Sequence, residues 1–203
     1  MRIGILVFDD VEVLDACGPF EVFSVANRVA LAAGGAAPFE VLLIADGPPG
    51  LVRARGGLPI QVGLGIGEAP ALDLLLVPGG VTDAVEADAE VVGWVTERAL
   101  ATPYVVSVCT GAFVLAQAGV LTDQRVTTHW DDLAALRDRW PDLDVVEDVR
   151  WVHASSAVRS GGDVYTSAGI SAGIDLALHL VEVLVDRDTA LSTARLMDYA
   201  WLE

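Results

Sequence analysis

The sequence predicts an α/β fold, a three-layer sandwich in which a mostly parallel sheet is covered by helices on both faces. Apolar runs typical of strands alternate with segments of helical periodicity along the chain. Most of these runs are apolar at consecutive positions, which indicates parallel strands buried on both faces. The 203 residues are 53% hydrophobic, enough for one sizeable core. We therefore expect residues 1–203 to form a single domain.

The main strands expected in the N-terminal half end at acidic residues, Gly or Pro. Strands are predicted over residues 2–8, 39–45 and 72–77, with short paired strands within 53–67. Helices are predicted over residues 14–29 and 91–100. Pro78-Gly79-Gly80 stops the third strand.

The C-terminal half is expected to continue the same alternation. A strand over residues 104–108 leads into a tight turn and a small helix, and a surface helix is predicted over 131–140. Short extended segments are predicted at 126–128, 145–149, 151–153 and 164–167. Two helices follow, over residues 171–185 and from 188 to near 199.

The composition excludes several classes of partner. The 29 acidic residues outnumber the 12 basic ones, and no basic patch is present to bind nucleic acid. Residues 99–122 carry no charge and could span a bilayer, but Pro103 and Gly111 divide them into strand and helix, so no membrane partner is expected. The first apolar run is too short for a secretory signal, and a cytoplasmic location is the default.

A candidate nucleophile stands in Ser107-Val108-Cys109-Thr110-Gly111, where an apolar strand gives way to a helix. Small residues two before and two after Cys109 are typical of a nucleophile elbow, because they let strand and helix approach closely. A position at a helix N-terminus favours the thiolate and would make Cys109 nucleophilic near neutral pH. The alternative is an inert core cysteine.

Other candidate site residues lie where neighbouring elements begin or end. Backbone amides of Gly79 and Gly80 could form an oxyanion hole over Cys109, or these residues could form a simple turn. Asp15, in an apolar setting, could have a raised pKa and act as general acid or base, or could only stabilise the helix dipole. His129 is the candidate histidine partner of Cys109.

No metal or cofactor site is predicted. His, Cys and carboxylate residues do not occur at metal-ligand spacings. The Gly-rich residues 63–67 lack the Lys of a phosphate loop and the spacing of a dinucleotide-binding loop. We expect neither a metal ion nor a nucleotide.

Together these segments resemble the ThiJ/PfpI superfamily, which has a flavodoxin-like, class I glutamine-amidotransferase-like fold. The resemblance is carried by five blocks in the family's order, at residues 14–23, 76–80, 108–113, 127–130 and 166–178. Cys109-Thr110-Gly111 and Thr127-Thr128-His129-Trp130 look most like isonitrile hydratase and the corresponding domain of AraC-type regulators. Those regulators continue into a DNA-binding region, whereas this chain stops at Glu203, which favours a stand-alone enzyme.

The resemblance implies a reaction and roles for residues. The Cys109 thiolate would attack the terminal carbon of a small isonitrile, Asp15 would handle protons, and water would release an N-substituted formamide. Thr110 would orient the site, and the backbone amides of Gly79 and Thr110 would stabilise developing negative charge. His129 would have only a supporting role in the reaction. The family is commonly dimeric, so a homodimer is expected.

Two alternatives remain open. A redox or ligand sensor could retain the same cysteine without turnover. A glyoxalase, deglycase or amidase-like hydrolase is known in the superfamily, although deglycases generally carry Glu at the position of Asp15. PfpI-like peptidases place His directly after the nucleophile, where this chain has Thr110, so peptidase activity is not expected.

Overall fold

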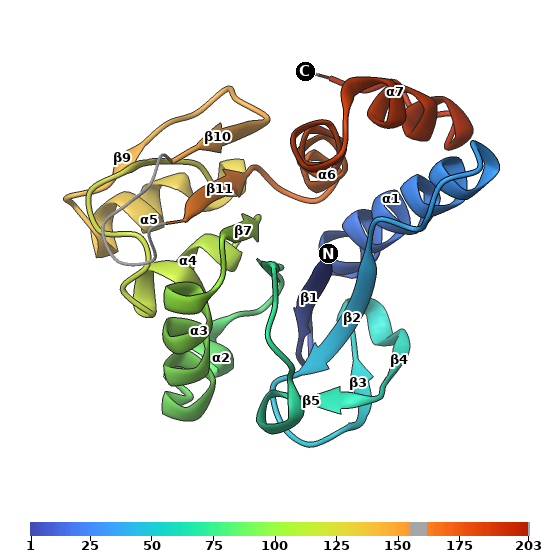
Figure 1. Ribbon diagram of the computed structural model, residues 1–203. Coiled ribbons are helices and arrows are strands. Elements are labelled where there is room, and N and C mark those ends of the chain that lie inside the picture. The colour runs from blue at the N-terminus through green and yellow to red at the C-terminus, as the bar shows by residue number, and fades with distance from the viewer. Residues whose placement is uncertain (155–161, 203) are drawn as a thin grey trace.

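A computed structural model describes residues 1–154 and 162–202 and shows a seven-stranded sheet of order β10-β11-β7-β6-β1-β2-β5 (Figure 1). All neighbouring pairs are parallel except β10 with β11. Its strands are β1 (Arg2–Val7), β2 (Glu40–Ala45), β5 (Leu64–Gly65), β6 (Leu74–Val77), β7 (Tyr104–Val108), β10 (Trp151–His153) and β11 (Asp163–Ser167). The predicted α/β class is confirmed.

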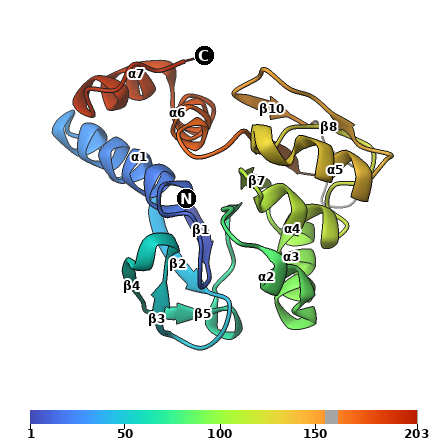
Figure 2. The same cartoon turned by 180° about the vertical axis from the view of Figure 1, so that it is seen from behind.

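Helices cover both faces of the sheet. One layer holds α1 (Val13–Ala32), α6 (Ala172–Leu184) and α7 (Arg187–Leu196), which pack against one another. The other side holds α2 (Asp83–Ala87), α3 (Ala89–Ala101), α4 (Gly111–Gln117) and α5 (Leu133–Arg139). The two views of Figures 1 and 2 show these groups separated by the sheet.

Two small sheets flank the main one. The antiparallel pair β3 (Gly50–Arg53) and β4 (Pro59–Val62) forms a hairpin near β2, and β8 (Arg125–Val126) pairs in parallel with β9 (Asp144–Val145). Short 3-10 turns complete the chain, at η1 (Arg55–Gly57), η2 (Ile66–Glu68) and η3 (Trp130–Asp132).

The central strands behave as their sequences predict. Five of the six residues of β1 and all four of β6 are buried, because layers of helices cover both faces of the sheet. The charge-free stretch 99–122 forms the end of α3, then β7 and α4. Among the described residues, no helix combines the length and apolar character needed to cross a membrane.

Several predicted boundaries were wrong. Pairing in the β3–β4 hairpin begins at Gly50, three residues before the predicted range of 53–67. In the segment predicted as extended at 145–149, residues 146–149 are not a strand. The helix α2 was not predicted, because five residues are too few to show helical periodicity. The last helix ends at Leu196 rather than near Tyr199, since Met197 and the left-handed Asp198 close it.

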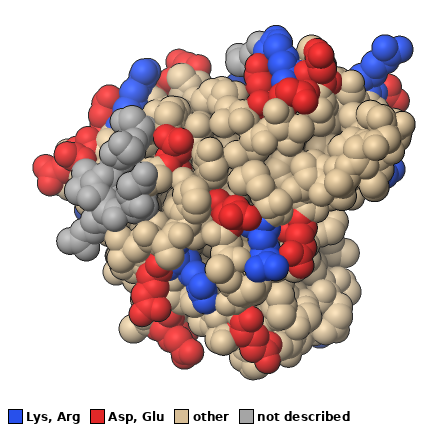
Figure 3. Space-filling model, viewed as in Figure 1, with Lys and Arg blue, Asp and Glu red and all other residues tan. Residues whose placement is uncertain are grey.

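Charged side chains on the face drawn in Figure 3 are mostly acidic, with Arg side chains lying singly among them. The chain contains no Lys, and its formal net charge is −17. A field of this sign repels polyanions.

We predict that Gly111→Ala destabilises the fold, because a Cβ there would overlap the Val77 carbonyl oxygen and lie 3.0 Å from the Pro78 oxygen. The expected loss in the free energy of unfolding is about 2 kcal/mol or more, measured by urea denaturation. Gly93→Ala, on the exposed side of α3 with nothing near its Cβ position, should instead add about 0.5–1 kcal/mol. Equal effects of both substitutions would contradict this packing argument.

Candidate active site

Cys109 occupies a strained turn between β7 and α4, as the elbow pattern predicts. Its φ of 55° lies in the left-handed region that non-glycine residues seldom adopt. The turn is held by two hydrogen bonds: the Cys109 N–H donates to the Ser167 carbonyl at 3.1 Å, and the Thr128 hydroxyl donates to the Cys109 carbonyl at 2.8 Å. Backbone strain of this kind is typical of functional sites.

Gly79 lets the end of β6 lie directly against this turn. A Cβ on Gly79 would stand 2.6 Å from the Thr110 nitrogen and 2.9 Å from the Cys109 Cβ. Only a residue without a side chain permits such an approach. The end of β6 therefore lies against Cys109.

Asp15 reaches the same place from the first turn of α1. Its side chain is fully buried, and Oδ2 accepts a hydrogen bond from the Gly79 N–H at 3.1 Å. The Cys109 thiol and the Ile170 N–H also face this carboxyl closely enough to lower its pKa. Among the described residues, however, Oδ1 has no hydrogen-bond partner of ordinary geometry. Asp15 thus lies beside Cys109 with one oxygen uncommitted.

Burial controls the ionisation of Asp15. Loss of water raises the pKa of this carboxyl to about 7, and the negative charge of Glu12 adds to the rise. The Gly79 N–H opposes the shift without cancelling it. Near neutral pH the group can therefore both release and accept a proton.

The thiol of Cys109 does not behave as the sequence predicted. Burial raises its pKa to about 12, and the charges of Asp15 and Asp132 raise it further, while the Thr110 N–H and hydroxyl oppose them. The expectation of a ready thiolate was wrong because the side chain is only 6% exposed and faces a carboxylate. The proton stays on sulfur unless a base removes it.

The glycine amides also differ from expectation. The Gly79 N–H is bound to Asp15, and the Gly80 N–H donates to the Thr110 hydroxyl at 2.9 Å. That hydroxyl also lies 3.0 Å from the Gly80 carbonyl, as a donor. Both amides predicted to form an oxyanion hole are thus already used inside the protein. They hold Asp15 and Thr110 in place.

His129 lies at the mouth of the site and contacts an acid that the sequence analysis missed. Its Nδ1 is 3.4 Å from an oxygen of Asp132, and its ring packs against Gly169. The charge of Asp132 also acts on the Cys109 thiol. The sequence feature that could have indicated this contact is the carboxylate of Asp132, three residues after His129. Only the η3 turn brings the two side chains together.

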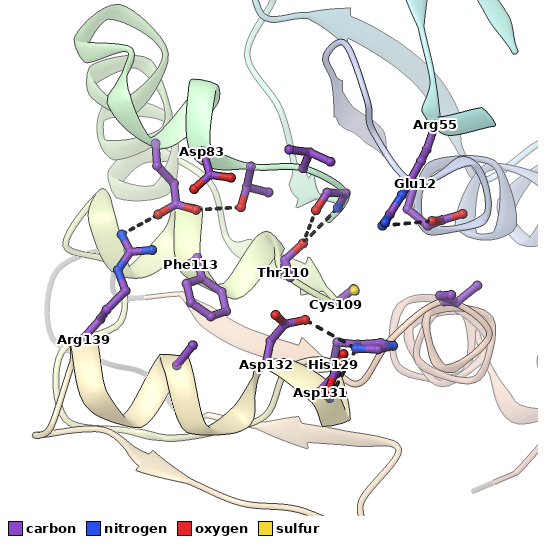
Figure 4. A pocket seen from close by; sticks show the side chains of 16 residues that line it. Glu12, Arg55, Asp83, Cys109, Thr110, Phe113, His129, Asp131, Asp132 and Arg139 are labelled. Carbon is purple, nitrogen blue, oxygen red and sulfur yellow. Dashed lines mark hydrogen bonds and ion pairs between the residues drawn. The ribbon is translucent and has the colours of Figure 1, made fainter. Parts of the chain in front are cut away.

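A cavity of about 460 Å³ opens over Cys109 (Figure 4). Its apolar lining is limited to a few side chains, among them Val81, Phe113 and Ile170. Most other lining side chains are charged or polar, from α2, the β7–α4 turn, η3 and α5: Asp83, Glu86, Thr110, His129, Asp131, Asp132 and Arg139. The cavity is open, as a hydratase would need, but it is far more polar than an aliphatic isonitrile would favour.

Comparison with known proteins places the site in a family context. The DJ-1/PfpI family profile matches residues 1–183. Isonitrile hydratase of Pseudomonas putida is 33% identical over 202 residues, which is 98% of this chain and 79% of that protein. The transcriptional regulator GbdR of Pseudomonas aeruginosa is 29% identical over 179 residues, covering 88% of this chain and 45% of the regulator.

A solved structure agrees with these sequence matches. The crystal structure of a ThiJ/PfpI family protein from Pseudomonas syringae superimposes with a TM-score of 0.81 at 27% identity. The match covers 98% of this chain and 74% of that one.

We predict that Asp15→Asn makes the stability of the protein less dependent on pH. The pKa of Asp15 is raised from 3.8 to about 7 in the folded protein. The stabilisation that this carboxyl contributes to the folded state is therefore complete below about pH 4 and lost as the pH rises to about 7. Each pKa unit is worth about 1.4 kcal/mol, so Asp15→Asn should gain up to about 4 kcal/mol relative to the unsubstituted protein across that interval. Urea unfolding at several pH values measures this difference. A constant difference would contradict the burial of an ionisable carboxyl.

Proposed function

Because this chain belongs to the DJ-1/PfpI family, we propose that it is a cysteine-dependent enzyme that adds water to a small isonitrile and releases an N-substituted formamide. The observation that carries the proposal is the pair formed by Asp15 and Cys109. A fully buried carboxyl with a pKa of about 7 lies beside a thiol in a strained elbow that opens onto a cavity. The resemblance of the elbow to isonitrile hydratase supports the choice of reaction.

The first step joins the thiol to the isonitrile carbon. Ionised Asp15 takes the thiol proton as the sulfur attacks, and the carbon–sulfur bond forms. Asp15 then returns that proton to the same carbon, so R–NC and Cys–SH combine to R–N=CH–S–Cys. A thiol with a pKa of about 12 needs such a base, because free thiolate is scarce near neutral pH.

The second step releases the product. A water molecule adds to the thioimidate carbon, the carbon–sulfur bond breaks, and nitrogen and sulfur each end with one proton. The products are R–NH–CHO and the regenerated thiol, so one isonitrile and one water give one formamide. Thr110 holds the loop that bears the Gly79 amide, and His129 supports the step from the cavity side, where water enters.

A second candidate is a ligand-binding module without turnover. The raised pKa of Cys109 favours it, since a thiol that keeps its proton is a weak nucleophile. The regulator GbdR shows that the family includes proteins named for control of transcription. Tight binding of a ligand that remains chemically unchanged would favour this candidate over the hydratase.

We also propose that the protein works as a homodimer, as the resemblance implies, and in the cytoplasm, as expected from a first apolar run too short for a secretory signal. Sedimentation velocity on the purified chain measures whether it forms a dimer. A single monomeric species at micromolar concentration would contradict it.

We predict that Cys109→Ala abolishes formation of formamide from cyclohexyl isocyanide, with a loss of at least about 1,000-fold in kcat. Cys17→Ser is the matched control, because Cys17 is the other free cysteine and lies outside the cavity lining. Product analysis by mass spectrometry measures both variants. Formamide production by folded Cys109→Ala protein would rule out covalent catalysis.

The pH dependence of catalysis tests the role of Asp15. Since attack needs the ionised carboxyl, kcat/KM should rise with pH up to about 7 and then level off. Asp15→Asn should remove this ascending limb and lower kcat by about 100-fold or more. An unchanged limb in Asp15→Asn would assign it to another group.

A further inference from the structure

The cavity over Cys109 is strongly acidic. In the described part of the chain, two guanidinium groups and five carboxylates line it, the carboxylates being those of Glu12, Asp83, Glu86, Asp131 and Asp132. Figure 4 shows Asp83 on one wall and Asp131 and Asp132 on the opposite wall. A ligand in the cavity therefore meets carboxylates on both sides.

Both guanidinium groups are already matched. Arg139 is paired with Glu86 at 2.6 Å, and Arg55 lies 3.8 Å from Glu12. Glu86 is further bound by the Thr82 hydroxyl. Among the described residues that line the cavity, these two pairs leave no guanidinium charge in excess for an anionic ligand.

The remaining carboxylates carry the excess negative charge. Within the described part of the chain, Asp83 and Asp131 have no ion-pair partner, and Asp132 faces only the imidazole of His129. Asp83 and Asp131 are exposed to the cavity and solvent rather than packed away. Their charges are therefore available to a ligand.

Two further features, independent of these charges, distinguish the inner end of the cavity. Cys109 opens onto it from a left-handed backbone conformation. Beside Cys109, although outside the cavity lining itself, the fully buried Asp15 has an oxygen, Oδ1, with no hydrogen-bond partner of ordinary geometry among the described residues. Strain and an unsatisfied buried oxygen mark the inner end as the place where a ligand reacts.

We propose that the substrate carries a positively charged group, such as an ammonium, which lies between Asp83 and the Asp131–Asp132 wall while its reacting carbon reaches Cys109. The nature of the reacting group rests on the proposed function, whereas the charge preference rests on the cavity alone. The two ends of the substrate thus meet different environments. The inner end is buried and the outer end is acidic.

Two isonitriles of nearly the same shape test this proposal. 2-Isocyanoethyl-trimethylammonium carries one positive charge, and 3,3-dimethylbutyl isocyanide replaces its quaternary nitrogen by carbon. We expect kcat/KM to be about tenfold higher for the cation at low ionic strength, and the ratio to fall as salt is added. The double variant Asp83→Asn/Asp131→Asn should bring the ratio down towards one. Asp142→Asn, an exposed carboxylate outside the cavity lining, should leave it unchanged.

A second experiment separates the charge preference from the reaction. In a Cys17→Ser background, methanethiosulfonates bearing a cationic, a neutral or an anionic ethyl group modify Cys109. A sulfur–sulfur bond forms and methanesulfinate leaves. We expect the cationic reagent to react about tenfold faster than the neutral one, and the anionic reagent to be slowest, with the differences shrinking in salt.

The outcomes are distinct. If neither isonitrile is consumed but the reagents keep this order, the hydratase proposal fails and the charge preference stands. If both isonitriles are consumed with equal kcat/KM, the charge preference is overturned and the hydratase stands. Equal rates for the three thiol reagents also overturn the charge preference.

Discussion

The left-handed backbone of Cys109 is the constraint on which the site depends. It turns β7 into α4 within two residues, and this sharp turn requires the end of β6 to lie against it. Gly79 and Gly111 make that approach possible, because side chains at these positions would overlap the neighbouring backbone. The same approach brings the Gly79 N–H to Asp15 on α1. The strained turn at Cys109 thus brings β6, β7 and α1 together at one site.

Two opposing effects determine the ionisation of Cys109 and Asp15. Oriented backbone N–H groups favour anions on Cys109 and Asp15, whereas burial disfavours both anions, and the charge of Asp15 further disfavours a thiolate on Cys109. Burial prevails, so the pair holds at least one proton, on sulfur, near neutral pH. Such a pair suits addition of a thiol across an unsaturated carbon, because the proton that leaves sulfur is the one that the carbon must gain.

The sequence alone predicted what depends on local pattern. Buried strands were visible as apolar runs, the elbow as small residues around Cys109, and Asp15 as an acid in an apolar setting. It could not predict which amides would be consumed, since the bond from Gly79 to Asp15 joins residues 64 positions apart. Nor could it predict the contact of His129 with Asp132, or the thiol's raised pKa, because both depend on tertiary packing.

The proposed reaction and the proposed recognition of the substrate involve different ends of the cavity. The inner end is built by the strand ends and α1, where Gly79, Cys109 and Asp15 leave little freedom to vary without loss of packing. The outer end is built by α2, η3 and α5, whose exposed side chains can change without disturbing the core. A family that keeps the elbow can therefore alter its ligands through these outer segments. If the proposed charge preference holds, the acidic outer wall is the part of the site that sets this chain's choice of substrate.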